Sequence, residues 1–214
     1  CAPGQKRARV SFAADRGFKS GAGWNYEMWE AFRPRAAFVA GALAWQGQRF
    51  TLGDRAGAST ANGIYASGGF FTTLGVGAAR GRVLTEDDDR PGQPPVALIS
   101  YALWQRRFAS APDVIGTSML VNQTPVTIVG VTAASFRGLE VGTAFDLALP
   151  LSAEPAVAGP SSALYKSRSY ILLVMLRLKD GQRASEATRT LRSLQSQLVA
   201  PNAPQSLRVF LLTL

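Results

Sequence analysis

Histidine is absent from the 214-residue sequence, and cysteine occurs only once, as Cys1. Without histidine, the chain cannot form a Ser-His or Cys-His nucleophile or a histidine-bearing zinc site. With one cysteine, it cannot form an internal disulfide, an iron–sulfur cluster or a thiolate zinc site. These two scarcities exclude the commonest catalytic and metal-binding constellations.

Long apolar runs are also missing. The run at residues 171–176 is far shorter than the ~20 residues that a membrane-spanning helix needs, and residues 1–15 lack the apolar core of a signal peptide. The hydrophobic fraction of 47% is ordinary for a folded protein, and the length suits one large domain or two small ones. Because the chain starts abruptly at Cys1 and stops in apolar residues 209–212, we expect it to be a segment of a longer protein.

Acidic residues are fewer than basic ones, 14 Asp and Glu against 23 Lys and Arg, which gives a net charge of +9. The excess is uneven: residues 1–60 carry +5, residues 61–160 carry −2 and residues 161–214 carry +6. A basic excess suggests nucleic acid, an anionic membrane surface or an acidic ligand as partner. An insertion between two halves of one basic unit explains this distribution, and chance clustering of surface arginines is the alternative.

Hydrophobic periodicity predicts an α+β fold with three clear helices. Asn25 is a plausible N-cap for a helix over residues 25–32, and Ser100 for one that runs to Phe108. A regular apolar stripe predicts the third helix, residues 184–198. Residues 69–74 read as one or two helical turns closed by Gly75.

Strand patterns surround these helices. Residues 169–178 form the strongest strand pattern and, with the third helix and residues 207–212, predict a βαβ or split βαβ unit. Residues 46–48 are interpreted as a turn and residues 152–163 as a linker. The other predicted strands cover residues 38–45, 49–52, 63–66, 96–99, 119–122, 126–131 and 145–151.

The glycine-rich and acidic motifs do not define a site. Residues 75–81 have the spacing GxGxxxG rather than the GxGxxG of a phosphate loop, which indicates a chain reversal. The acidic run 86–89 lacks the spaced ligands of a calcium loop, so we interpret it as a solvated loop neutralised by Arg82 or Arg90, and cation binding there stays open.

Other candidate residues for chemistry are isolated. Asp146 and Glu140 are carboxylates near apolar strands, but their spacing does not mark an acid–base pair. Ser67 is not in a GxSxG motif and has no histidine as base. We therefore expect no catalytic, cofactor-binding or metal-binding residues. The basic and aromatic residues near the N-terminus could contact phosphates and bases, but without a nucleic-acid-binding motif we expect no such partner; they are Arg9, Arg16, Lys19, Trp24 and Tyr26.

A series of motifs in the middle of the chain resembles the MacB-like periplasmic core domain. The resemblance is in order and at sensible spacing from about residue 60 to residue 151, and the strand that ends at Gly181 also fits. The first 35 residues match loosely, through Tyr26, Trp29 and Phe32-Arg33. The motifs that carry it are residues 63–71, 74–76, 81–82, the acidic run 86–89, 95–101, 103–108, 114–116, 129–131, 136–139 and 146–151.

The resemblance implies a periplasmic or extracytoplasmic domain of an ABC transporter permease in a bacterial inner membrane, lying between two transmembrane helices. The version with Phe136-Arg137-Gly138 is most similar to the acidobacterial-type permease family. The implied fold has a Porter-like split βαβ subdomain, residues 1–66 and 161–214, and an inserted mixed α/β, strand-rich, Sabre-like subdomain, residues 67–160. This division agrees with the charge distribution.

The implied function is mechanical and not enzymatic. A cytoplasmic ATP-binding subunit or domain hydrolyses ATP, and the domain couples the resulting transmembrane motion to a substrate or partner outside the membrane. The resemblance also implies a membrane-fusion protein as partner, a dimer in the full-length transporter and a membrane-proximal position, with no cofactor. The alternative is an extracytoplasmic ligand-sensing or binding module of another membrane protein. Arg82 is expected to pair with the acidic run, and Phe70, Phe71, Trp104 and Phe108 to pack the inserted part.

Overall fold

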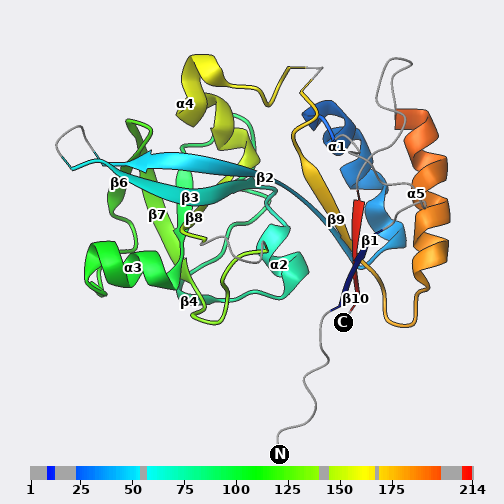
Figure 1. The fold of residues 1–214 in the computed structure, drawn as a ribbon, viewed down its shortest axis with the longest axis horizontal. Coiled ribbons are helices and arrows are strands. Elements are labelled where there is room, and N and C mark those ends of the chain that lie inside the picture. The colour runs from blue at the N-terminus through cyan, green and yellow to red at the C-terminus, as the bar shows by residue number, and fades with distance from the viewer. Residues whose placement is uncertain are drawn as a thin grey trace, which may run out of the picture. The chain divides into compact units, whose positions relative to one another are not determined.

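The computed structural model describes residues 9–12, 23–53, 57–139, 145–166, 169–198 and 209–213. The chain divides into two compact units (Figure 1): unit 1 is Cys1–Ala44 with Tyr165–Leu214, and unit 2 is Trp45–Leu164. None of the helices in these described stretches is long and apolar enough to cross a membrane.

The secondary structure is mixed, with strands in the majority. The strands are β1 Arg9–Phe12, β2 Gly41–Leu52, β3 Ser59–Ala66, β4 Ala78–Gly81, β5 Val96–Ile99, β6 Ser118–Val121, β7 Thr124–Thr132, β8 Leu147–Pro150, β9 Leu173–Arg177 and β10 Val209–Thr213. The α-helices are α1 Tyr26–Phe32, α2 Phe70–Leu74, α3 Tyr101–Phe108, α4 Glu154–Ala158 and α5 Ala184–Leu198. Three short 3₁₀ helices are η1 Arg33–Phe38, η2 Leu151–Ala153 and η3 Gly159–Ser161.

The first boundary between the units lies inside β2, whereas the sequence analysis expected it after residue 66. The reason is the β2–β3 pairing, which runs antiparallel from Trp45 opposite Ala66 to Leu52 opposite Ser59. This ladder holds β3 and the second half of β2 in the same unit. The chain returns to unit 1 at Tyr165, four residues after the expected position.

Unit 1 is built on a βαβ unit. Strand β10 pairs with β9 in parallel, with α5 between them in the chain, and β1 pairs with β10 in antiparallel. Because β9 and β10 pair directly, this is a plain βαβ unit rather than the split one expected. The core of unit 1 includes Trp24, Trp29 and Phe32, all nearly inaccessible to solvent. The Trp24 and Phe32 ring centroids lie 5.1 Å apart.

The paired strands of unit 2 form a closed ring. Following the pairings from β2 leads through β3, β8, β5, β7 and β6 and back to β2, and β4 is added beside β7. A closed ring leaves fewer unpaired backbone groups than an open sheet does. Strand β7 contacts three strands in this arrangement, which confirms that it is central. Phe50 and Tyr65 pack edge to face, 5.2 Å apart, and are buried.

The helix ends follow the predicted capping chemistry. Asn25 Oδ1 accepts a hydrogen bond from the Met28 amide at 2.8 Å, and Ser100 Oγ accepts one from the Leu103 amide at 3.0 Å. Gly75 ends α2 in the left-handed conformation, with φ of 73°, as its position predicted. These three predictions and the helix over residues 184–198 are confirmed.

Two expected connections are wrong. Residues 46–48 are not a turn, because β2 passes through them and pairs with β3 at each position. Residues 152–163 are not a linker, because residues 151–161 form η2, α4 and η3. The tight turn between β6 and β7 lies at Asn122 and Gln123, with φ of 48° and 68°, one residue before the predicted connection.

Candidate functional site

The acidic run forms a turn that is tied to the rest of unit 2. Arg82 donates two hydrogen bonds to Asp88, with N–O distances of 2.6 and 2.7 Å, and the Thr85 amide and hydroxyl each donate to Asp88 at 2.8 Å. Burial raises the pKa of Asp88, but these hydrogen bonds outweigh it and lower the pKa below its ordinary value. The hydrogen bond to Asp88 raises the pKa of Arg82. The prediction that Arg82 pairs with the run is confirmed.

The neighbouring carboxylates point to other partners. Asp89 is buried and accepts hydrogen bonds from the amides of Gly68, at 3.1 Å, and Ser152, at 2.8 Å. Asp87 is exposed and pairs with Arg90 at 2.7 Å. No group of three potential metal-ligating side chains converges in the described parts of the chain. Asp89 therefore ties the backbone at Gly68 to the backbone at Ser152.

Asp146 also makes hydrogen bonds that connect separate elements of unit 2. It accepts hydrogen bonds from the Asn62 amide at 3.0 Å and from Arg106 at 2.9 Å, which joins β8 to β3 and α3. Ser67 is buried, and Glu140, the other predicted carboxylate, lies outside the described residues. The pairing of Asp146 with Glu140 is therefore not tested by the described residues.

A buried carboxylate that the sequence analysis missed lies in α4. Glu154 accepts hydrogen bonds from the Ser162 hydroxyl at 2.6 Å and the Ala163 amide at 2.9 Å. Burial, followed by the charge of Glu154, raises the pKa of the Tyr65 phenol. The signal for the helix is Pro155, because proline is favoured at the first positions of a helix. These hydrogen bonds link α4 to the residues that follow η3, at the end of unit 2.

Unit 2 also contains a cavity of about 420 Å³ that the sequence analysis did not predict. It lies against β2 and β3, on the face opposite Phe50 and Tyr65, because adjacent residues of a strand point to opposite faces. Apolar side chains from four separate segments line it: Trp45, Ile64, Phe70, Phe136, Leu139 and Phe145. Its volume and apolar lining make it a candidate ligand site of unit 2.

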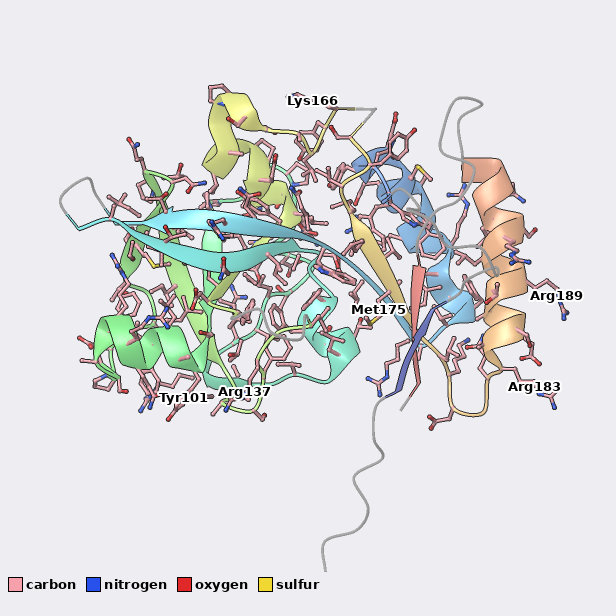
Figure 2. All side chains as sticks on the ribbon, in the orientation of Figure 1. Tyr101, Arg137, Lys166, Met175, Arg183 and Arg189 are labelled. Carbon is pink, nitrogen blue, oxygen red and sulfur yellow. The ribbon has the colours of Figure 1, made fainter. Side chains whose placement is uncertain are left out.

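Unit 1 differs from unit 2 in its large excess of basic residues. It contains 15 Lys and Arg against five Asp and Glu, a net +10, whereas unit 2 contains eight against nine, a net −1. Arg183 and Arg189 are exposed, and Figure 2 shows both side chains pointing away from the strands of unit 1. Glu186, which is also exposed, is the acidic residue between them. The excess of basic residues in the chain therefore lies in unit 1.

The fold and these motifs agree with one family. The model of the MacB-like periplasmic core domain matches residues 4–194. The chain belongs to this family. It is a periplasmic domain of an ABC transporter permease, and thus of a bacterial inner-membrane protein.

Similar curated proteins are much longer than the matched region. The Macrolide export ATP-binding/permease protein MacB of Burkholderia cenocepacia (strain HI2424) is 28% identical over 128 residues, which is 60% of this chain and 18% of the relative. The protein of the same name from Burkholderia lata is 29% identical over the same shares. The match therefore spans about a fifth of the length of these relatives.

Solved structures show the same fold at low identity. The periplasmic region of MacB from Actinobacillus actinomycetemcomitans has a TM-score of 0.64 at 16% identity, over 89% of this chain and 83% of that one. The extracellular domain of the noncanonic ABC-type transporter YknZ from Gram-positive bacteria has a TM-score of 0.58 at 13% identity, over 89% of both chains. A putative permease domain from Porphyromonas gingivalis has 0.56 at 18%, over 91% and 81%.

Proposed function

We propose that this MacB-like domain transmits motion of the transporter's transmembrane helices to a substrate or a partner protein outside the inner membrane. A cytoplasmic ATP-binding subunit or domain hydrolyses the ATP. The observation that carries the proposal is the family match over residues 4–194. The domain has no catalytic role in it, and the contacts of Asp88, Asp89, Asp146 and Glu154 support structural roles for those acids.

Unit 1 is the proposed entry point of the motion. It contains the βαβ unit and 15 of the 23 basic residues of the chain, which in this proposal face the membrane. Strand β2 starts in unit 1 at Gly41 and continues to Leu52 in unit 2. The chain passes from one unit to the other inside β2, so β2 is the proposed mechanical connection, and the proposal includes a change in the distance between the units when motion enters unit 1. A membrane-fusion protein as partner and a dimeric transporter belong to the same proposal.

Distance measurements in the full-length transporter test the coupling. Spin labels are attached to Ser185→Cys in unit 1 and Ala102→Cys in unit 2, two exposed helix positions, after the other cysteines have been replaced by serine. Pulsed electron paramagnetic resonance then compares the nucleotide-free transporter with the vanadate-trapped one. We expect a different distance distribution in the trapped state, because coupling requires the domain to respond to nucleotide.

A label pair within unit 2, Ala102→Cys with the exposed Thr60→Cys, is the matched control and should give the same distribution in both states. If the pair that spans the two units is also unchanged while the labelled transporter still hydrolyses ATP, transmission through this domain is contradicted.

A further inference from the structure

Aromatic rings form much of the wall of the cavity in unit 2: Trp45, Phe70, Phe136 and Phe145 line it, and Phe71, which does not line it, packs on both Phe70 and Phe136. Trp45 packs on Phe70 with ring centroids 6.1 Å apart, Phe70 on Phe71 at 4.9 Å, Phe71 on Phe136 at 5.7 Å and Phe136 on Phe145 at 5.2 Å. Each pair is edge to face, the geometry that aromatic rings prefer. Trp45, Phe70 and Phe71 are buried, so their neighbours hold them in place. The wall is preformed and suits the apolar body of a ligand.

Strands β2 and β3, which border the cavity, also supply polar groups. Arg49 and Asn62 are direct cross-strand neighbours and both line the cavity. The Arg49 guanidinium is exposed and, in the part of the chain that the structure describes, forms no ion pair. Arg82, Arg90 and Arg106 of the same unit each pair with an aspartate. Arg49 is therefore a cation available for an anionic ligand.

The volume sets the size of that ligand. The cavity of about 420 Å³ is in the lower part of the range of roughly 300–1,000 Å³ that small-molecule sites cover. Gly47 lies between Trp45 and Arg49 on β2 and also lines the cavity, so the β2 backbone itself is open to a ligand there. An apolar ring system or a short chain with one charged group fits these dimensions.

We propose that this cavity binds a small amphiphilic anion. Its apolar part lies against the aromatic wall, its anionic group pairs with Arg49, and the side-chain NH2 group of Asn62 donates a second hydrogen bond to that group. This site is separate from the coupling proposed above, because it needs neither ATP nor the transmembrane helices.

Binding is tested on the whole 214-residue chain with anilinonaphthalene sulfonate, an aromatic amphiphile with one negative charge. Calorimetry and fluorescence should show one bound molecule per chain. Arg49→Gln should raise Kd about tenfold, the loss typical of a charge-assisted hydrogen bond. Ile64→Trp, which places a larger side chain in the cavity, should abolish binding. The cation naphthylmethylammonium, of similar shape, should bind far more weakly than the anion.

Arg107→Gln is the matched control, because Arg107 is an exposed arginine of unit 2 that contacts Ser59 and does not line the cavity; it should leave Kd unchanged. Circular dichroism checks that Ile64→Trp is folded, and if it is not, the pair Arg49→Gln and Arg107→Gln decides. The proposal is overturned if the anion does not bind, if the cation binds equally well, if the two arginine variants behave alike or if folded Ile64→Trp retains full affinity. A negative result here leaves the distance test of coupling unaffected.

Discussion

The two units use charge in different ways. Unit 2 is almost neutral, and Arg82 and Arg106 are paired with Asp88 and Asp146 inside its own fold. Unit 1 carries a net +10, and although Arg33 pairs with Glu30 at 3.0 Å, its cations outnumber its acids threefold. Charge in unit 2 is therefore nearly balanced within the unit, whereas unit 1 has ten more basic than acidic residues, among them the exposed Arg183 and Arg189. The strand and helix arrangement of the two units does not by itself require this difference in net charge.

If each unit has its own hydrophobic core, truncating a buried tryptophan in one unit should destabilise that unit. This substitution should give the largest loss of unfolding free energy. Trp104 in unit 2 is 5% exposed, and its indole N–H donates to the Ala111 carbonyl at 2.9 Å. Trp29 in unit 1 is 1% exposed. We expect Trp104→Ala and Trp29→Ala each to lower the free energy of unfolding by about 3–5 kcal/mol, measured by urea denaturation, because each leaves a large cavity.

Hydrogen exchange then shows where the damage lies. Trp104→Ala should lower amide protection in residues 45–164 alone, and Trp29→Ala in unit 1 alone. Gln105 is an exposed position on the same helix as Trp104. Gln105→Ala should change neither the free energy of unfolding nor the amide protection of either unit. Loss of protection in both units from either tryptophan variant would contradict two separate cores.

The Arg82–Asp88 pair tests the internal use of charge in unit 2 with an intermediate effect. Because the folded pKa of Asp88 lies below its ordinary value of 3.8, the stabilisation is complete above that pH and is lost as the pH falls through the lower, folded pKa. Asp88→Asn should cost about 1–2 kcal/mol at neutral pH, as expected for hydrogen bonds to a charged group. The difference in the free energy of unfolding between Asp88→Asn and the unsubstituted chain should become smaller as the pH falls below 3.8.

Denaturation over a pH series measures this dependence. Asp87→Asn is the control, because the Asp87 side chain is 79% exposed and its pair with Arg90 is a surface ion pair. A deficit of Asp88→Asn that is the same at every pH would show that the carboxylate charge is not what stabilises the turn.

The features of the fold that depend on residues close together in the sequence were predicted well. Asn25 and Ser100 cap helices because their side-chain oxygens reach an amide three residues ahead, an interaction that needs no distant partner. The apolar stripe of α5 is equally local, and Ala187 and Leu191 on it are buried. The order of several motifs indicated the family, which the match over residues 4–194 confirms.

Long-range arrangement was not predictable in the same way. The register that carries β2 through residues 46–48 depends on β3, and the closed ring depends on β6 meeting β2 through Leu52 and Val121. The cavity gathers Trp45, Phe70 and Phe136 from three separate segments. Such features follow from which strands pair, and hydrophobic periodicity does not encode strand pairing. The candidate ligand site was therefore invisible before the fold was known.

Substituting an exposed cation of unit 1 should give the smallest effect of the substitutions considered. If the exposed cations of unit 1 face anionic lipid, the chain should bind vesicles that contain phosphatidylglycerol more tightly than vesicles of phosphatidylcholine alone. Arg189→Gln should weaken that binding roughly fivefold, because a basic residue near an anionic surface contributes about 1 kcal/mol. Sedimentation with vesicles at low and high salt measures the effect, and high salt should remove it.

Arg90→Gln is the counterpart in unit 2, since Arg90 is exposed and belongs to the unit with nearly balanced charge. It should leave vesicle binding unchanged. Equal losses from Arg189→Gln and Arg90→Gln would mean that the whole chain binds lipid as a diffuse cation, and the contrast between the units would then have no functional meaning at the membrane. A loss confined to Arg189→Gln would instead support unit 1 as the membrane-proximal part, because only its surface would respond to anionic lipid.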